Sequence, residues 1–227
     1  MHKLFRNIKV SLKPFSQTTN KINYGWSNSP FGQCVIFIKS SIIVGLAFKN
    51  DHSKDQIEIE MKSQWKKSNI DFVSTSPKKL AEQFFYNEEV NIAVAGSQIQ
   101  VKVWDALLNV QKGATATYTE IAHAAGYPKA IRAVASAVGK NPIAWLIPCH
   151  RVIRKSGDNG GYRWGSDIKS KMLAYEAQNK LYRRPDTLLA DGVISRFPSL
   201  RAMNIPDPMI RIIPTKDQES GNSLHKK

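Results

Sequence analysis

The stretch Ile147-Pro148-Cys149-His150-Arg151-Val152 carries one of only two cysteines in this 227-residue chain. The cysteine follows a proline and precedes a histidine, and the basic residues Arg151, Arg154 and Lys155 come soon after it. Nearby positive charge stabilises a thiolate, which is the nucleophilic form of cysteine. We therefore expect Cys149 to ionise readily, although most buried cysteines only fill space in a core.

The charge of the chain indicates a polyanionic partner. Its formal net charge is +15 and its pI about 9.8, which is typical of proteins that bind nucleic acid. A solvated basic surface with basic tails is the alternative. Basic residues also surround the cysteine in sequence: Lys129, Arg132, Lys140, Arg151, Arg154, Lys155 and Arg163. The sequence contains no apolar run of about 18 residues, so we expect no membrane partner.

The two cysteines, Cys34 and Cys149, are too few for a disulfide framework or a zinc site. We therefore expect no metal, no cofactor and a reducing location, which is the cytoplasm, or the nucleus or an organelle in a eukaryote. The N-terminus lacks the pattern of a secretory signal. Residues 1–30 are expected to form a basic, flexible arm, with an organellar transit peptide as the alternative.

Residues 31–94 are predicted to form a small α/β domain. Two apolar runs, 34–38 and 42–48, indicate a β-hairpin that places Cys34 in the core. A capping box at Ser53 begins a helix whose buried face repeats every four residues. A second helix is expected to start at Ser76-Pro77, and the alternation through residues 90–94 predicts a strand.

Residues 95–180 are predicted to form a helical, winged-helix-like domain. Capping boxes at Ser97 and Thr117 begin two helices, and a third is expected over 129–138 after the turn Gly126-Tyr127-Pro128. Two short helices joined by such a turn match a helix-turn-helix. Within Ala130–Gly139, Arg132 is the one long side chain among small residues, which suits a groove or a base stack, or a tight helix–helix contact.

The region after the cysteine is predicted to contain a β-ribbon and a last helix. Segments 152–154 and 162–164 flank a strong turn signal, which would form the wing. In the helix over 167–178, Glu176 is directed toward the core, where an unpaired carboxylate is costly, so His150 is its expected partner. An exposed Glu176 near the helix end is the alternative. Residues 181–227 are expected to be a flexible tail.

A base beside a thiol, oriented by a carboxylate, is the general arrangement of an activated nucleophile. Cysteine peptidases share it, but neither a helix-turn-helix nor basic charge serves proteolysis. Four motifs resemble the O6-alkylguanine-DNA alkyltransferase family of the Ada/Ogt type. They are Pro148-Cys149-His150-Arg151-Val152, Asn141-Pro142, Lys129-Ala130-Ile131-Arg132-Ala133-Val134 and Gly161-Tyr162-Arg163-Trp164-Gly165. The similarity is strong from about Gly96 to Gln178.

This resemblance implies an α+β fold with a ribonuclease H-like N-terminal domain, and direct reversal of DNA alkylation by a monomer. A flipped O6-alkylguanine in double-stranded DNA would pass its alkyl group irreversibly to Cys149, with O4-alkylthymine as a further candidate substrate. His150 would take the thiol proton through a water, and Glu176 would orient His150. The resemblance also implies roles in DNA or base binding for Tyr118, Arg132, Asn141, Val152, Tyr162 and Arg163.

Two other functions are compatible with parts of this pattern. A lesion-binding protein without chemistry resembles the family but replaces the acceptor cysteine, whereas Cys149 is present here. A winged-helix transcription regulator would not require Cys149, His150 and Glu176 together. The bifunctional Ada proteins also carry a cysteine-rich zinc domain, and this chain has no cysteines for it.

Overall fold

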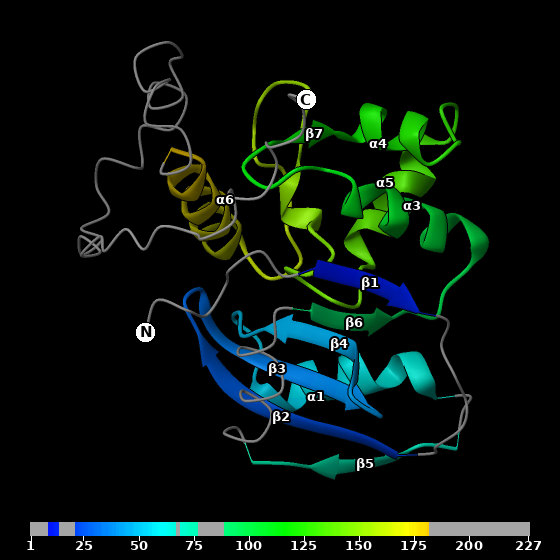
Figure 1. Ribbon diagram of the computed structural model, residues 1–227, viewed down its shortest axis with the longest axis vertical. Helices are drawn as coiled ribbons and strands as arrows, with labels where there is room; N and C mark the ends of the chain where they lie inside the picture. Colours follow the sequence, from blue (N-terminus) through cyan, green and yellow to red (C-terminus); the bar gives the residue numbers. More distant parts are fainter. Residues whose placement is uncertain (1–8, 14–20, 67–68, 77–88, 182–227) are drawn as a thin grey trace, which may run out of the picture. The chain divides into compact units, whose positions relative to one another are not determined.

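The computed structural model describes residues 9–13, 21–66, 69–76 and 89–181, all within one unit that extends to Asp191. Six strands of its first half form one sheet in the order β1-β6-β4-β3-β2-β5 (Figure 1). Their bounds are Lys9–Lys13 (β1), Lys21–Ser29 (β2), Gly32–Lys39 (β3), Ile42–Phe48 (β4), Asp71–Ser74 (β5) and Glu89–Ala93 (β6). The β2–β3 and β3–β4 pairs are antiparallel, and the others are parallel.

The predicted hairpin and first helix are confirmed. The β3–β4 turn uses Ser40 and Ser41 with φ of 46° and 67°, the positive values that a two-residue hairpin turn needs. The first helix, α1 (Lys54–Lys62), begins with the capping box at Ser53 and continues into a short 3-10 turn, η1 (Ser63–Trp65). The helix lies close to the sheet, because a Cβ added at Gly45 of β4 would come 3.1 Å from Met61 Cε.

The expected flexible arm over residues 1–30 is wrong for two segments. Lys9–Lys13 pairs with β6, and Lys21–Ser29 pairs with β3 over seven residues. The second strand was missed because its polar residues hide the alternation, yet Ile22 is fully buried and Tyr24 stacks on Phe37 at 5.4 Å. The helix expected at Ser76-Pro77 and the tail beyond Leu181 lie outside the described residues.

The second half is helical, as predicted (Figure 1). Its elements are α3 (Gln98–Leu108), β7 (Ala116–Thr117), α4 (Tyr118–Ala124), α5 (Ile131–Gly139), η2 (Cys149–Arg151), β8 (Val152–Ile153) and α6 (Ser166–Leu181). Both capping boxes, at Ser97 and Thr117, are present. Gly126, with φ of 79°, turns the chain between α4 and α5. The α+β fold class is confirmed.

The segment that leads to the cysteine is attached to the sheet. The Leu46 N–H donates to the Pro142 carbonyl at 3.0 Å, and the Ala144 N–H donates to the Leu46 carbonyl at 2.9 Å. These groups of β4 are available because β6 pairs with β4 at a single position, Ile43 with Ile92. The sheet therefore anchors residues 142–144 directly before the cysteine.

The predicted β-ribbon is not formed. β8 pairs in parallel with β7, and residues 162–164 form no strand. The buried Lys169 of α6 instead donates to the carbonyls of Val152 and Asn159, which ties both sides of the loop to the helix. No helix in the described ranges is long and apolar enough to cross a membrane.

Candidate active site

The cysteine lies in a wholly buried segment, from Asn141 to His150. Its last turn has Pro148 at φ −81° and ψ 59°, with a 2.8 Å hydrogen bond from the Cys149 N–H to the Ile147 carbonyl. This geometry is that of an inverse γ-turn, to which the fixed φ of proline is suited. The proline therefore sets the direction in which Cys149 enters η2.

Asn141 braces this turn through three hydrogen bonds. Its Nδ2 donates to the Ile147 carbonyl at 2.8 Å and to Cys149 Sγ at 3.0 Å, while its Oδ1 accepts from the Ile143 N–H at 3.0 Å. Asn141 is only 2 % exposed, so all three bonds are shielded from water. The Asn141 side chain thus links the start of the buried segment, at Ile143, to its end, at Ile147 and the Cys149 sulfur.

The expectation that Cys149 ionises readily is wrong for the resting protein. Burial raises the pKa of the Cys149 thiol, and this outweighs the hydrogen bonds from Asn141 and Tyr162 and the charge of Lys169. The neighbouring cations in sequence contribute little, because Arg154 and Lys155 are exposed and Arg151 binds elsewhere. A neutral thiol in such a site needs a base before it can react.

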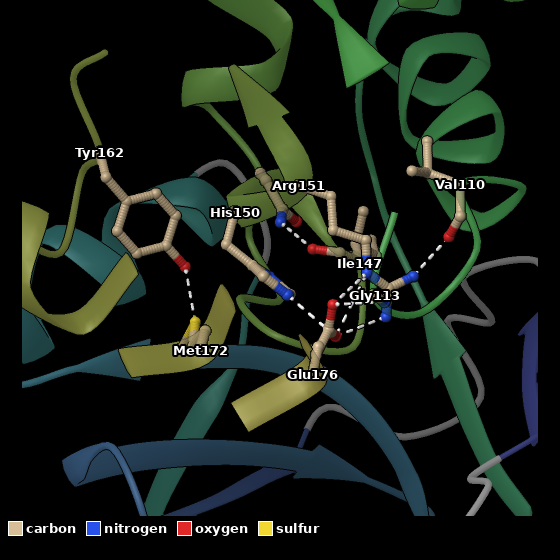
Figure 2. Close-up of polar contacts among 9 residues, drawn as sticks. Val110, Gly113, Ile147, His150, Arg151, Tyr162, Met172 and Glu176 are labelled. Carbon is tan, nitrogen blue, oxygen red and sulfur yellow. Dashed lines mark hydrogen bonds and ion pairs between the residues drawn. The ribbon is translucent and has the colours of Figure 1, made fainter. Parts of the chain in front are cut away.

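His150 and Glu176 meet as predicted, and Arg151 joins them (Figure 2). His150 Nε2 lies 3.1 Å from Glu176 Oε1, and Arg151 Nη2 donates to the same oxygen at 2.7 Å. The Gly113 N–H donates to Glu176 Oε2 at 3.2 Å, and Arg151 Nη1 also donates to the Val110 carbonyl. The carboxylate is therefore held from three directions.

Burial and the neighbouring charges together set the ionisation of Glu176 and His150. Burial raises the pKa of Glu176, but hydrogen bonds and positive charge from His150 and Arg151 prevail and lower it to about 2. Burial lowers the pKa of His150, although Glu176 opposes this. Among the described residues, no protein group hydrogen bonds to His150 Nδ1, which is fully buried. The imidazole is thus neutral at rest and has one nitrogen free to accept a proton.

A cavity of about 320 Å³ opens onto the cysteine. Five of the predicted site residues line it: Tyr118, Asn141, Cys149, Tyr162 and Arg163. The Tyr162 hydroxyl donates to Met172 Sδ at 3.6 Å, and burial together with its interaction with the sulfur of Cys149 raises the pKa of Tyr162 well above its usual value. Cys149 is 7 % exposed, so the sulfur is reached only through this cavity. A reacting group must therefore meet the sulfur inside this cavity.

The other predicted site residues lie outside the cavity lining. His150 and Glu176 are buried behind the cysteine, and the carbonyl of Val152 accepts from Lys169. Arg132 is exposed on α5 beside Ala133 and Ser136. Arg163, which does line the cavity, donates from its guanidinium to Glu60 Oε1 of α1 at 2.6 Å.

Two residues of the site were missed in the sequence. Arg151 was counted only as a basic neighbour, although its place next to His150 in a buried motif could have indicated a shared partner. Lys169 was overlooked among surface lysines, yet it lies three residues before Met172 on the apolar arc of its helix. Burial lowers the pKa of Lys169 to about 8, against the opposing charge of Cys149.

Fold and site together define an α+β protein with a helix-turn-helix beside a buried cysteine, histidine and glutamate. The family described as 6-O-methylguanine DNA methyltransferase, DNA binding domain, matches residues 98–178. The chain is 40% identical over 136 residues to the methylated-DNA–protein-cysteine methyltransferase of Methanosarcina acetivorans, covering 58% of this chain and 85% of that protein. The chain belongs to the methylated-DNA–protein-cysteine methyltransferase family.

One further relative and one solved structure agree with this family assignment. The chain is 47% identical over 87 residues to the Escherichia coli bifunctional transcriptional activator/DNA repair enzyme Ada, covering 38% of this chain. That match spans only 25% of the length of Ada. The crystal structure of Mycobacterium tuberculosis OGT in complex with DNA aligns with a TM-score of 0.54 and 30% identity, covering 69% of this chain and 93% of that one.

Proposed function

We propose that this chain repairs DNA by accepting the alkyl group of O6-alkylguanine on the sulfur of Cys149, once per molecule. The observation that carries this proposal is the position of the thiol at the base of the cavity, with Asn141 3.0 Å from the sulfur and His150 next to it in the chain. The names of the relatives support it, since they act on methylated DNA through a cysteine.

The order of events follows from the charges. His150 Nδ1 takes the thiol proton, through a water, and Glu176 balances the imidazolium that results. The thiolate then attacks the alkyl carbon, so a carbon–sulfur bond forms as the bond from carbon to guanine O6 breaks. The electron pair of that bond stays on the guanine, which takes up a proton and leaves as the normal base. The thioether in Cys149 is stable to water, so transfer is irreversible.

Burial of the sulfur supports base flipping. A stacked guanine cannot bring its O6 substituent to a thiol that is 7 % exposed, so the nucleotide must leave the duplex and enter the cavity. We propose that Arg132 fills the space vacated in the stack, and that Tyr118 contacts the adjacent phosphate and the base. Tyr162 and the main chain at Val152 and Arg163 would bind the guanine. Burial and the charge of Cys149 raise the pKa of Tyr118, which keeps its hydroxyl protonated.

The exposed face of α5 supports the DNA-binding role. Arg132, Ala133 and Ser136 are exposed, whereas Val134, Ala137 and Val138 pack inward. The small exposed residues let the helix approach a groove closely, and Arg132 is the one charged side chain on this face, beside the exposed Ile131. We propose that residues 95–180 form the DNA-binding alkyltransferase domain, that the sheet region before residue 95 is a separate domain, and that the protein acts as a monomer.

Intact-mass measurement tests the transfer. The full chain is incubated with a duplex that contains one O6-methylguanine, and we expect one methyl group on the peptide with Cys149, in a one-to-one reaction. The Cys149→Ala variant should bind the duplex and receive no methyl group. An unmodified Cys149 under tight lesion binding would instead indicate a lesion sensor without chemistry.

A further inference from the structure

Trp145 has an unusual backbone conformation within the buried segment. Its φ is 69°, and the other described non-glycine residues with positive φ, Ser40 and Ser41, form the hairpin turn. The Leu146 N–H donates to the Ala144 carbonyl at 2.8 Å, which closes a three-residue γ-turn with Trp145 at its centre. This type of γ-turn, with positive φ at its central residue, is rare and strained. Strain of this kind persists only where surrounding contacts enforce it, and it gathers at functional sites.

The indole ring of Trp145 stacks on His150. The two ring centroids are 5.1 Å apart and the planes differ by 14°, so the rings lie nearly parallel. The γ-turn thus holds an aromatic face against the imidazole that is next to the acceptor cysteine.

Other aromatic rings hold the indole in place. Phe31, which connects β2 to β3, lies 4.5 Å from Trp145 between centroids, and Tyr175 of α6 lies 6.0 Å away. Phe31 and Tyr175 also contact each other at 5.5 Å, edge to face. Trp145 is therefore enclosed by the sheet region on one side and by α6 on another, which restricts its ring as well as its backbone.

We propose that Trp145 is a positioning residue, whose indole face orients the His150 ring and stabilises the imidazolium that forms when His150 accepts the Cys149 proton. The face of an aromatic ring attracts a cation, and tryptophan does so most strongly. The attraction is larger when the cation is desolvated, and His150 is fully buried. The inference rests on the proposed alkyl transfer, in which His150 is the base.

The surroundings of His150 leave room for such a contribution. Glu176 favours the imidazolium, whereas burial, Arg151 and Lys169 oppose it. The titratable and charged groups near the ring and its cysteine are Tyr118, Cys149, Arg151, Tyr162, Lys169 and Glu176. Arg151 and Glu176 form an ion pair with each other, so the carboxylate charge is shared. The face of the Trp145 ring would stabilise the imidazolium of His150 in addition to Glu176, and it would partly offset the opposing effects of burial and of Arg151.

The pH dependence of transfer in the full chain distinguishes this role from space filling. Near neutral pH the reactive thiolate depends on proton transfer to His150, and we expect Trp145→Leu to react about 3- to 30-fold more slowly than the unaltered protein. As the pH rises above the raised pKa of Cys149, hydroxide in place of His150 can remove the thiol proton, and the deficit should shrink. Trp145→Phe keeps an aromatic face and should fall between the two.

Trp65→Leu is the matched control. Trp65 is 5 % exposed and Trp145 is 8 % exposed, and Trp65 packs in the sheet domain on Phe37 and Phe72. This control should lose stability without changing the shape of the pH profile. A deficit in Trp145→Leu that is the same at every pH would overturn the proposal.

A nuclear magnetic resonance titration of the unaltered protein tests the stack without any variant. The ring protons of Trp145 should shift with the same midpoint as those of His150, and an indole that does not respond to His150 protonation would overturn the proposal. This readout needs no alkyl transfer. If the unaltered chain transfers no methyl group, the proposed function fails, while the titration still decides whether Trp145 senses the charge of His150.

Discussion

The side-chain amide of Asn141 lies 3.0 Å from the sulfur of Cys149 and also holds the Ile147 carbonyl at 2.8 Å. The same amide group therefore contacts both the backbone turn and the sulfur of Cys149. Stability and transfer should consequently depend on the same side chain.

Asn141→Ala should destabilise the protein and slow methyl transfer. It leaves the Ile143 N–H without its partner in a buried segment, and it removes one of the two hydrogen bonds to the Ile147 carbonyl, which keeps the Cys149 N–H. Each unsatisfied buried group costs about 1–3 kcal/mol. Urea unfolding measures the loss, and single-turnover kinetics measures the rate. Asn109→Ala, which removes an exposed bond to the Asp105 carbonyl, is the control and should leave both nearly unchanged. Equal effects of the two variants would show that Asn141 does not brace the turn.

Glu176→Gln should make the free energy of unfolding less dependent on pH in the acid range. The pKa of Glu176 is lowered from 4.5 to about 2 in the folded protein. The resulting stabilisation, about 3 kcal/mol, is present above pH 4.5 and is lost as the pH falls toward 2. Denaturant midpoints measured between these pH values should fall steeply for the unaltered protein and less for the variant. Parallel curves would contradict the assigned ionisation.

Lys169→Met should make the Cys149 thiol harder to ionise. The charge of Lys169 lowers the pKa of Cys149, so its removal leaves burial less opposed. Alkylation by iodoacetamide, followed against pH in a Cys34→Ala background, should move to higher pH. Lys169→Arg keeps the charge and is the comparison. A midpoint that moves equally in both variants would indicate that the carbonyl contacts to Val152 and Asn159 matter more than the charge.

Arg132→Ala should slow methyl transfer from duplex DNA and have little effect with a single-stranded lesion. The residue is exposed, so the stability should change by less than about 0.5 kcal/mol. Lys129→Ala removes a neighbouring exposed charge and is the control for simple loss of phosphate attraction. If both variants slow the duplex reaction equally, Arg132 contributes only charge and does not assist flipping.

Much of the architecture could be predicted because local rules agree with the fold. The capping boxes at Ser53, Ser97 and Thr117 mark helix starts, since the bonds that satisfy them lie within four residues. The hairpin over β3 and β4 follows from two apolar runs around a short turn. The strand β2 was not predicted because its own residues are largely polar. It is a strand because it pairs with β3, and that pairing is not visible in the local sequence.

The sequence by itself determined the class of protein and brought forward the proposed acceptor cysteine and its histidine, because these lie together in one short motif. It also placed Glu176 on the inward face of its helix. Only the tertiary structure decided that the resting thiol is neutral, since burial depends on how the whole chain encloses Cys149. It also decided that Arg151 shares Glu176, that Lys169 ties down the loop, and that Trp145 stacks on His150. These contacts join residues from different elements, so their distances and shielding from water arise only when the elements pack.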